Sequence, residues 1–167
     1  MIPCPVFFAN PFVRTRIDLS FDYSQFGEYY GDKHDLRTAI EYQRKTLTIR
    51  RDLAASDPKD VWKQGRLAWT LTTTAGLLIE THDYRAALAY LDESGRISER
   101  LGMSDRDTIA LTLKNTGEAN RAIGNEQAAC EQFSKARDLY RKLGYSPSSS
   151  MGPELADLEK DLATCAR

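Results

Sequence analysis

The feature that most constrains the fold of this 167-residue chain is a short pattern that occurs three times. Each copy has a turn-forming pair, then an alanine followed by an apolar residue, then an aromatic residue. The three alanines are Ala39, Ala87 and Ala129. They are 48 and 42 residues apart. Self-similarity at this spacing is typical of a helical repeat array, in which each unit buries its apolar face against the next.

A small residue stands twelve positions before each of these alanines. These residues are Gly27, Ala75 and Gly117. Two helices that pack closely need a small residue where their backbones approach. The pattern therefore predicts three helical hairpins, at about residues 20–53, 68–101 and 110–143, and together they fill residues 20–145.

These positions resemble the tetratricopeptide repeat family over most of residues 20–143. The long spacing looks like that of kinesin-light-chain repeats, and it is similar to the repeat tails of bacterial eukaryotic-like serine/threonine kinases. The resemblance implies an all-α fold, a right-handed superhelix of three helical hairpins plus a C-terminal capping helix. The sequence departs from the family pattern at two positions, where Gln43 and Thr46 stand in place of the usual aromatic residue and alanine.

The two ends of the chain are predicted separately. Prolines in residues 1–19 favour an extended N-terminal segment, which either covers the first repeat, fills the groove of the array, or docks on a second copy to give a homodimer. Asp57-Pro58 is expected to start a helix. Residues 146–152 form a linker rich in serine, and 153–167 form an amphipathic capping helix, which repeat arrays need for solubility.

Composition excludes several classes of partner. A formal net charge of −1 gives no field for nucleic acid or anionic lipid, and no apolar run is long enough to span a membrane. The N-terminus is a poor signal peptide because prolines interrupt its apolar stretch. Three widely spaced cysteines, Cys4, Cys130 and Cys165, suggest free thiols in a reducing, cytoplasmic location.

The sequence carries no catalytic constellation. We find no glycine-rich phosphate loop, Cys-x-x-Cys pair, nucleophile elbow or kinase signature, so we predict that the chain is not an enzyme and has no cofactor. His34 and His82 share a turn position with Gly124, which favours a turn role over a metal site. Cys130 stands at the repeat position that Ile40 and Leu88 occupy in the first two units. This predicts that Cys130 is a buried small hydrophobic residue.

What remains is a surface for binding. Stacked hairpins present a concave face made mainly of first helices. Side chains expected there are Glu28, Asp32, Trp69, Thr72, Thr73, Ile79, Lys114, Asn115, Glu118 and Arg121. This set runs from acidic at the first unit to basic at the third. Tetratricopeptide domains that hold C-terminal carboxylates use a basic and asparagine-rich clamp, for which only Lys114 and Asn115 are suitable, so that specificity is not carried over.

Two hypotheses of function follow. We favour a non-catalytic protein–protein interaction module that binds a peptide or protein partner in its concave groove. The alternative is a regulatory or sensory segment of a larger signalling protein, such as a bacterial serine/threonine kinase. Neither hypothesis involves nucleic acid or a membrane.

Overall fold

The structure, a computed structural model, describes residues 11–102, 106–145 and 152–165. These residues form seven α-helices and, within the ranges described, no strand. The helices are α1 (Pro11–Asp32), α2 (Leu36–Ser56), α3 (Val61–Glu80), α4 (Tyr84–Leu101), α5 (Arg106–Ala122), α6 (Glu126–Lys142) and α7 (Gly152–Cys165). The all-α fold class is confirmed.

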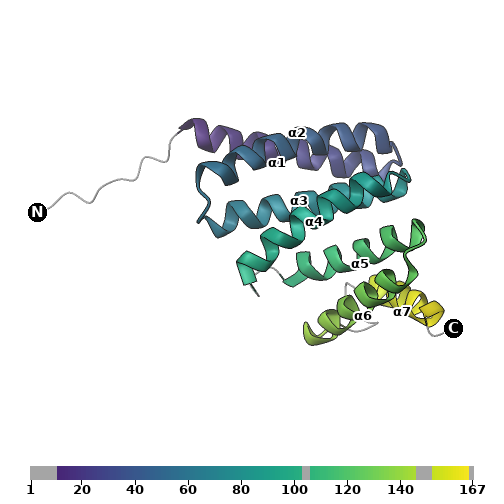
Figure 1. The fold of residues 1–167 in the computed structure, drawn as a ribbon. Coiled ribbons are helices and arrows are strands. Elements are labelled where there is room, and N and C mark those ends of the chain that lie inside the picture. The colour runs from purple at the N-terminus through teal and green to yellow at the C-terminus, as the bar shows by residue number, and fades with distance from the viewer. Residues whose placement is uncertain (1–10, 103–105, 146–151, 166–167) are drawn as a thin grey trace, which may run out of the picture.

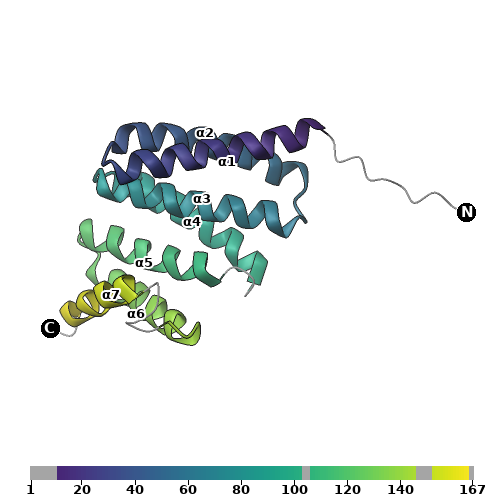
Figure 2. The ribbon, with the colours of Figure 1, turned by 180° about the vertical axis from the view of Figure 1, so that it is seen from behind.

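Successive helices pair into three hairpins that stack one after another (Figure 1). Within each pair a three-residue turn joins the helices: α1 with α2, α3 with α4, and α5 with α6. Helices α1, α3 and α5 lie on the side seen in Figure 2, and α2, α4 and α6 lie on the opposite side. We call the side formed by α1, α3 and α5 the first-helix face. Helix α7 packs on α6 at the C-terminal end of the stack.

The small residues mark the close approach inside each hairpin, as the sequence predicts. A Cβ atom on Gly27 would lie 2.8 Å from Nε2 of Gln43, and one on Gly117 would lie 2.5 Å from Cε1 of Phe133. Ala75 is fully buried in a core cluster that also contains Leu91. Gln43, Leu91 and Phe133 each stand sixteen residues after the small residue. The register of the three units is therefore the same.

Each first helix ends in the same hydrogen-bonded turn. At the end of α1, the amide of His34 donates to the carbonyl of Gly31 (2.8 Å), and that of Asp35 donates to Tyr30 (2.9 Å). This Schellman pattern requires a left-handed residue, and His34 (φ 57°), His82 (φ 62°) and Gly124 (φ 86°) adopt that conformation. The turn role of both histidines is confirmed.

We expect His34→Gly to stabilise the fold, because glycine accepts a positive φ without a steric penalty. The gain should be about 1 kcal/mol or less, since glycine also has more entropy to lose on folding. His82→Gly should gain less, because Nδ1 of His82 lies 2.7 Å from the Tyr84 hydroxyl and that hydrogen bond would be lost. Thermal unfolding of the two variants measures these changes. The reverse substitution in the third unit, Gly124→His, should lower the melting temperature. A lower melting temperature for His34→Gly would contradict this account.

The structure corrects two predicted helix starts. Residues 11–19 are helical and not extended: α1 begins at Pro11, because proline is favoured in the first turn of a helix, where its missing amide costs nothing. Residues 1–10 lie outside the described part of the chain. Helix α3 begins at Val61 and not at Pro58, because Asp60 caps it by accepting from the Lys63 amide.

Helix α7 covers the end of the array, as expected of a capping helix. Leu155 and Leu158 are buried against Phe133, Ala136 and Tyr140 of α6, and Leu162 packs beside them. Most of the linker predicted at 146–152 lies outside the described residues. Across those that are described, no helix is both long enough and apolar enough to cross a membrane.

The structure overturns the prediction of free cysteines. Cys130 of α6 and Cys165 of α7 form a disulfide, and both residues are half-buried. Cys130 is not a core residue like Ile40: among the described residues, α6 is followed by the single helix α7, and the two cysteines lie half-buried where α6 and α7 meet. Cys4 lies outside the described residues.

Candidate functional site

Two cavities in the described part of the chain share helix α3 of the first-helix face. The first, which we call the acidic pocket, has a volume of about 580 Å³. Its walls come mainly from α1 and α3, with one side chain from α2, and the residues are Gly27, Glu28, Gly31, Asp32, His34, Gln43, Thr73, Leu77 and Glu80. Three carboxylates line this pocket and no lysine or arginine does. Of the predicted binding residues, Glu28, Asp32 and Thr73 lie here.

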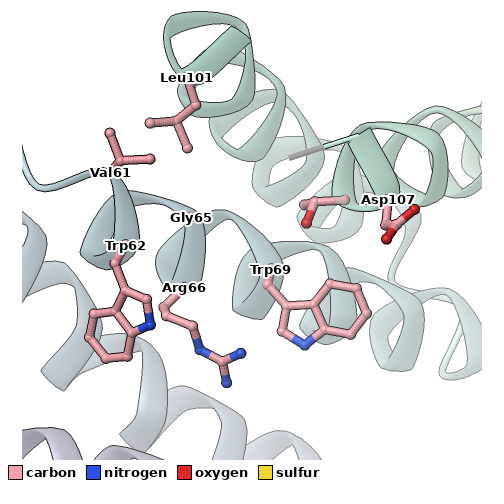
Figure 3. Close-up of a pocket in the computed structure, with 8 residues that line it drawn as sticks. Val61, Trp62, Gly65, Arg66, Trp69, Leu101 and Asp107 are labelled. Carbon is pink, nitrogen blue, oxygen red and sulfur yellow. The ribbon is translucent and has the colours of Figure 1, made fainter. Parts of the chain in front are cut away.

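The second cavity, which we call the tryptophan pocket, has a volume of about 460 Å³. It is lined by Val61, Trp62, Gly65, Arg66, Trp69, Leu101, Asp107 and Thr108. Trp62, Arg66 and Trp69 extend from the same side of α3 (Figure 3). Trp62 is 48% exposed, although its ring centroid is 6.2 Å from that of Phe21 in α1. Trp69 was predicted here from the sequence, whereas Trp62 and Arg66 were not.

The two pockets are connected by one stripe of side chains on α3. Trp62, Arg66, Trp69, Thr73, Leu77 and Glu80 recur every three or four residues. Residues at this spacing lie on the same face of a helix. This helical spacing was the signal that would have added Trp62 and Arg66 to the predicted site.

Two of the predicted binding residues are buried and hold helices together. Thr72 is fully buried, and its Oγ1 lies 2.8 Å from Ser94 Oγ of α4 and 2.7 Å from Thr112 Oγ1 of α5. Asn115 of α5 is 6% exposed and donates to the Thr72 carbonyl at 3.3 Å. The placement of both in the groove was wrong. Buried hydroxyl groups are hydrogen-bonded in this way because an unpaired one is costly.

Four more predicted residues have partners within the fold. Ile79 packs against the core cluster around Ala75 and Leu78. Lys114 pairs with Glu118 one turn away, with Nζ and Oε1 2.7 Å apart. Arg121 is held by the capping helix, with Nη1 2.6 Å from Asp161 Oδ1 and Nη2 3.0 Å from the Asp161 carbonyl.

The basic end predicted for the concave face is therefore neutralised. The guanidinium of Arg121 also pairs with Glu126 at 3.1 Å and lies 4.6 Å from the centroid of the Phe133 ring. Since both cations have carboxylate partners, the predicted gradient from acidic to basic is absent at its basic end. The three carboxylates of the acidic pocket remain without such partners.

Comparison with known proteins agrees with this architecture. The tetratricopeptide repeat family model matches residues 66–142, which include most of α3 and all of α4, α5 and α6. Over this stretch, a little under half of the chain, the sequence is similar to tetratricopeptide repeats. The stretch begins within α3 and leaves out the first hairpin, whose Gly27 and Ala39 occupy the same register as the small residues of the repeats.

A solved structure with the same fold is the N-terminal domain of stress-induced protein-1 (STI-1) from C. elegans. The sequences are 13% identical, and the TM-score is 0.60 over 91% of this chain and 98% of that chain. At this identity the likeness shows the helical-repeat fold alone. No curated protein matches the sequence. The resemblance to kinase repeat tails stays a prediction from the sequence.

The arrangement bears on the carboxylate clamp considered from the sequence and on metal binding between α6 and α7. Asn115 is buried between α3 and α5 and Lys114 is paired, so the two residues suited to a carboxylate clamp are occupied within the fold. Glu126 lies beside Cys130 and Cys165, but two sulfurs bonded to each other are not thiolates and do not bind a metal. Among the described residues, the cavities lined by the stripe on α3 are the acidic pocket and the tryptophan pocket.

Proposed function

We propose that the chain is a non-catalytic protein-interaction module, and that its first-helix face binds a peptide across the acidic and tryptophan pockets. The observation that carries this proposal is the stripe on α3, which lines both pockets and joins them. A ligand that fills both must be extended along α3, as a segment of polypeptide can be. Helical repeat arrays commonly use such extended surfaces for binding.

The acidic pocket favours a basic side chain of the partner. Glu28, Asp32 and Glu80 provide three carboxylates, and none of the ion pairs found among the described residues uses them. The side chain of Gln43 is buried at the wall of this pocket, and its Oε1 has no hydrogen-bond partner there. A lysine or arginine would supply both the charge and the donor.

The tryptophan pocket favours an apolar or aromatic side chain. Trp62 and Trp69 provide large apolar surfaces, and tryptophan is enriched among residues that dominate binding energy. The α3 residues that line the two pockets are centred roughly 12 positions apart, which is about 18 Å along a helix. An extended peptide covers that distance in about five residues, so the expected ligand has an apolar residue about five positions from a basic one.

A display library of random peptides, selected against the purified protein, tests this proposal. We expect the selected peptides to share that spacing of apolar and basic residues. Truncation by Trp69→Ala should weaken binding by about thirtyfold or more, since truncating a central tryptophan typically costs about 2 kcal/mol or more. Charge reversal by Glu28→Lys and Glu80→Lys should reduce the rate of association and its salt dependence.

The matched control is Glu131→Lys, which makes the same charge change on α6, away from both pockets. It should leave affinity unchanged. If Glu131→Lys weakened binding as much as Glu28→Lys, net charge and not the pocket would explain the effect. Selected peptides that bind the Trp69→Ala variant normally would remove the tryptophan pocket from the site.

Location and assembly remain predictions from the sequence. The proposed cytoplasmic location no longer has the support of free thiols, because Cys130 and Cys165 are bonded and disulfides are rare in a reducing cytosol. A homodimer through residues 1–19 would involve the beginning of α1, because residues 11–19 belong to that helix.

A further inference from the structure

One arginine is buried where the other repeats carry neutral side chains. Arg50 of α2 is 2% exposed. The 48- and 42-residue offsets between units place Ser98 and Tyr140 at the same repeat position, and both are buried. A guanidinium is therefore not needed at this position to stack one hairpin on the next.

The charge of Arg50 is not balanced by a carboxylate. Its Nη1 donates to the hydroxyl of Thr70 and to the carbonyl of Arg66 (3.4 Å), while its Nη2 has no hydrogen-bond partner. Arg66 itself has a buried Nε without a partner. Among the described residues, no carboxylate is within ion-pair distance of either guanidinium.

Burial, together with the charge of Arg66, lowers the pKa of Arg50 to about 10, while Glu28 acts in the opposite direction. Arg50 thus remains protonated at neutral pH. Two neighbouring cations with unused donors in a partly desolvated site are costly in the free protein, because a buried charge is stabilised only when it is paired. An anion that accepted from both would remove that cost.

Aromatic rings surround the two guanidinium groups. The Phe21 ring centroid is 5.5 Å from Cζ of Arg50 and 4.9 Å from Cζ of Arg66. Trp62 lies beside Phe21, and Arg66 extends between Trp62 and Trp69 at the wall of the tryptophan pocket (Figure 3). An anion that carries an aromatic or apolar group has a surface for that group here.

We propose that Arg50 and Arg66 form a binding site for a phosphate monoester at the inner wall of the tryptophan pocket. A phosphate monoester carries close to two negative charges and three acceptor oxygens, and arginine forks match this geometry. Arg66 makes the first contact, and rotation of Phe21 admits an oxygen to Nη2 of Arg50. The phosphate is carried by a peptide side chain or by a small molecule such as a nucleotide. The peptide source rests on the function proposed above, and the small-molecule source does not.

The first test is thermal unfolding at constant ionic strength with inorganic phosphate, O-phosphotyrosine, O-phosphoserine and a nucleoside monophosphate. Phosphate monoesters should raise the melting temperature, whereas the same concentration of sodium chloride should not. Tryptophan fluorescence gives the dissociation constants. A preference for phosphotyrosine would identify a peptide source, and one for the nucleotide would identify a small-molecule source. No stabilisation by any of the four compounds would overturn the proposal.

Two variants test the arginines themselves. Arg66→Gln should weaken binding of phosphate monoesters by about ten- to hundredfold, the usual effect of losing a charged hydrogen bond. Arg50→Met should abolish the phosphate-dependent rise while raising the melting temperature without ligand, because it removes a buried unbalanced charge. Arg44→Gln, an exposed change on α2, is the matched control and should behave as wild type.

These variants also separate the two proposals. If a selected basic peptide without phosphate still binds Arg50→Met, the first-helix face functions independently of the phosphate site. Unchanged phosphate affinity in both Arg50→Met and Arg66→Gln would overturn the phosphate site. A lower melting temperature for Arg50→Met, with no phosphate effect on the wild type, would show that Arg50 is a structural residue.

Discussion

Gly117→Leu is expected to destabilise the third hairpin by about 1–3 kcal/mol, the usual cost of overpacking a core. The cause is Phe133, whose side chain is fully buried against the glycine. A Cβ atom at position 117 would lie 2.5 Å from Cε1 and 2.6 Å from Cδ1 of the ring. Phe133 has little freedom to move, because it is packed into the cluster that α6 shares with α7.

A matched pair of alanine substitutions isolates the steric effect. Gly117→Ala should lower the melting temperature because even one methyl group meets the Phe133 ring. Gly95→Ala makes the same change in α4, where a Cβ would meet no atom within 4 Å. It should stabilise by about 0.5–1 kcal/mol, because alanine has the higher helix propensity. Equal effects of the two substitutions in thermal unfolding would disprove the close packing at Gly117.

The hairpins could be predicted from the sequence because their positions follow from local rules. Small residues at fixed spacing mark where helices approach, and the left-handed turn at His34, His82 and Gly124 marks where each first helix ends. These signals repeat, so each copy supports the others. Helix starts lack such repetition. The start of α1 at Pro11 was missed because proline was interpreted as a helix breaker, and the start of α3 was placed at Pro58 because the cap at Asp60 was not recognised.

The candidate site could be predicted only in part, since exposure depends on distant residues. Nothing near Thr72 in the sequence indicates that Ser94 and Thr112 enclose its hydroxyl from two other helices. Arg121 is likewise engaged by Asp161, forty residues away, across the connection to the capping helix. Glu28, Asp32 and Trp69 line the two pockets because the helix face on which they lie is set by their own spacing, and their role in binding stays a prediction.

The disulfide was missed for the same reason. Cysteine count and spacing carry no information on whether a terminal helix returns to α6. Cys130 and Cys165 meet because α7 uses Leu155 and Leu158 to bury the open side of the last hairpin, which brings its end to Cys130.

Reduction of the Cys130–Cys165 bond is expected to lower the free energy of unfolding by roughly 3–4 kcal/mol. The bond closes a loop of about 35 residues, and this restricts the entropy of the unfolded chain. The double variant Cys130→Ser, Cys165→Ser should show the same loss without reductant. In the native state α7 would then be held by its leucines and by the pairing of Arg121 with Asp161. It should exchange its amide hydrogens faster than α6 does.

The measurement is chemical denaturation with and without reductant, combined with hydrogen exchange of α7. Cys4→Ser is the matched control, because it removes a thiol and leaves the bond intact. It should unfold as wild type does and should remain sensitive to reductant, whereas the double variant should not respond to it. If the oxidised wild-type protein and the double variant unfolded at the same denaturant concentration, the bond would contribute nothing to holding α7. The leucines of α7 and the ion pairs of Asp161 and Glu159 would then be sufficient to hold α7 on the array.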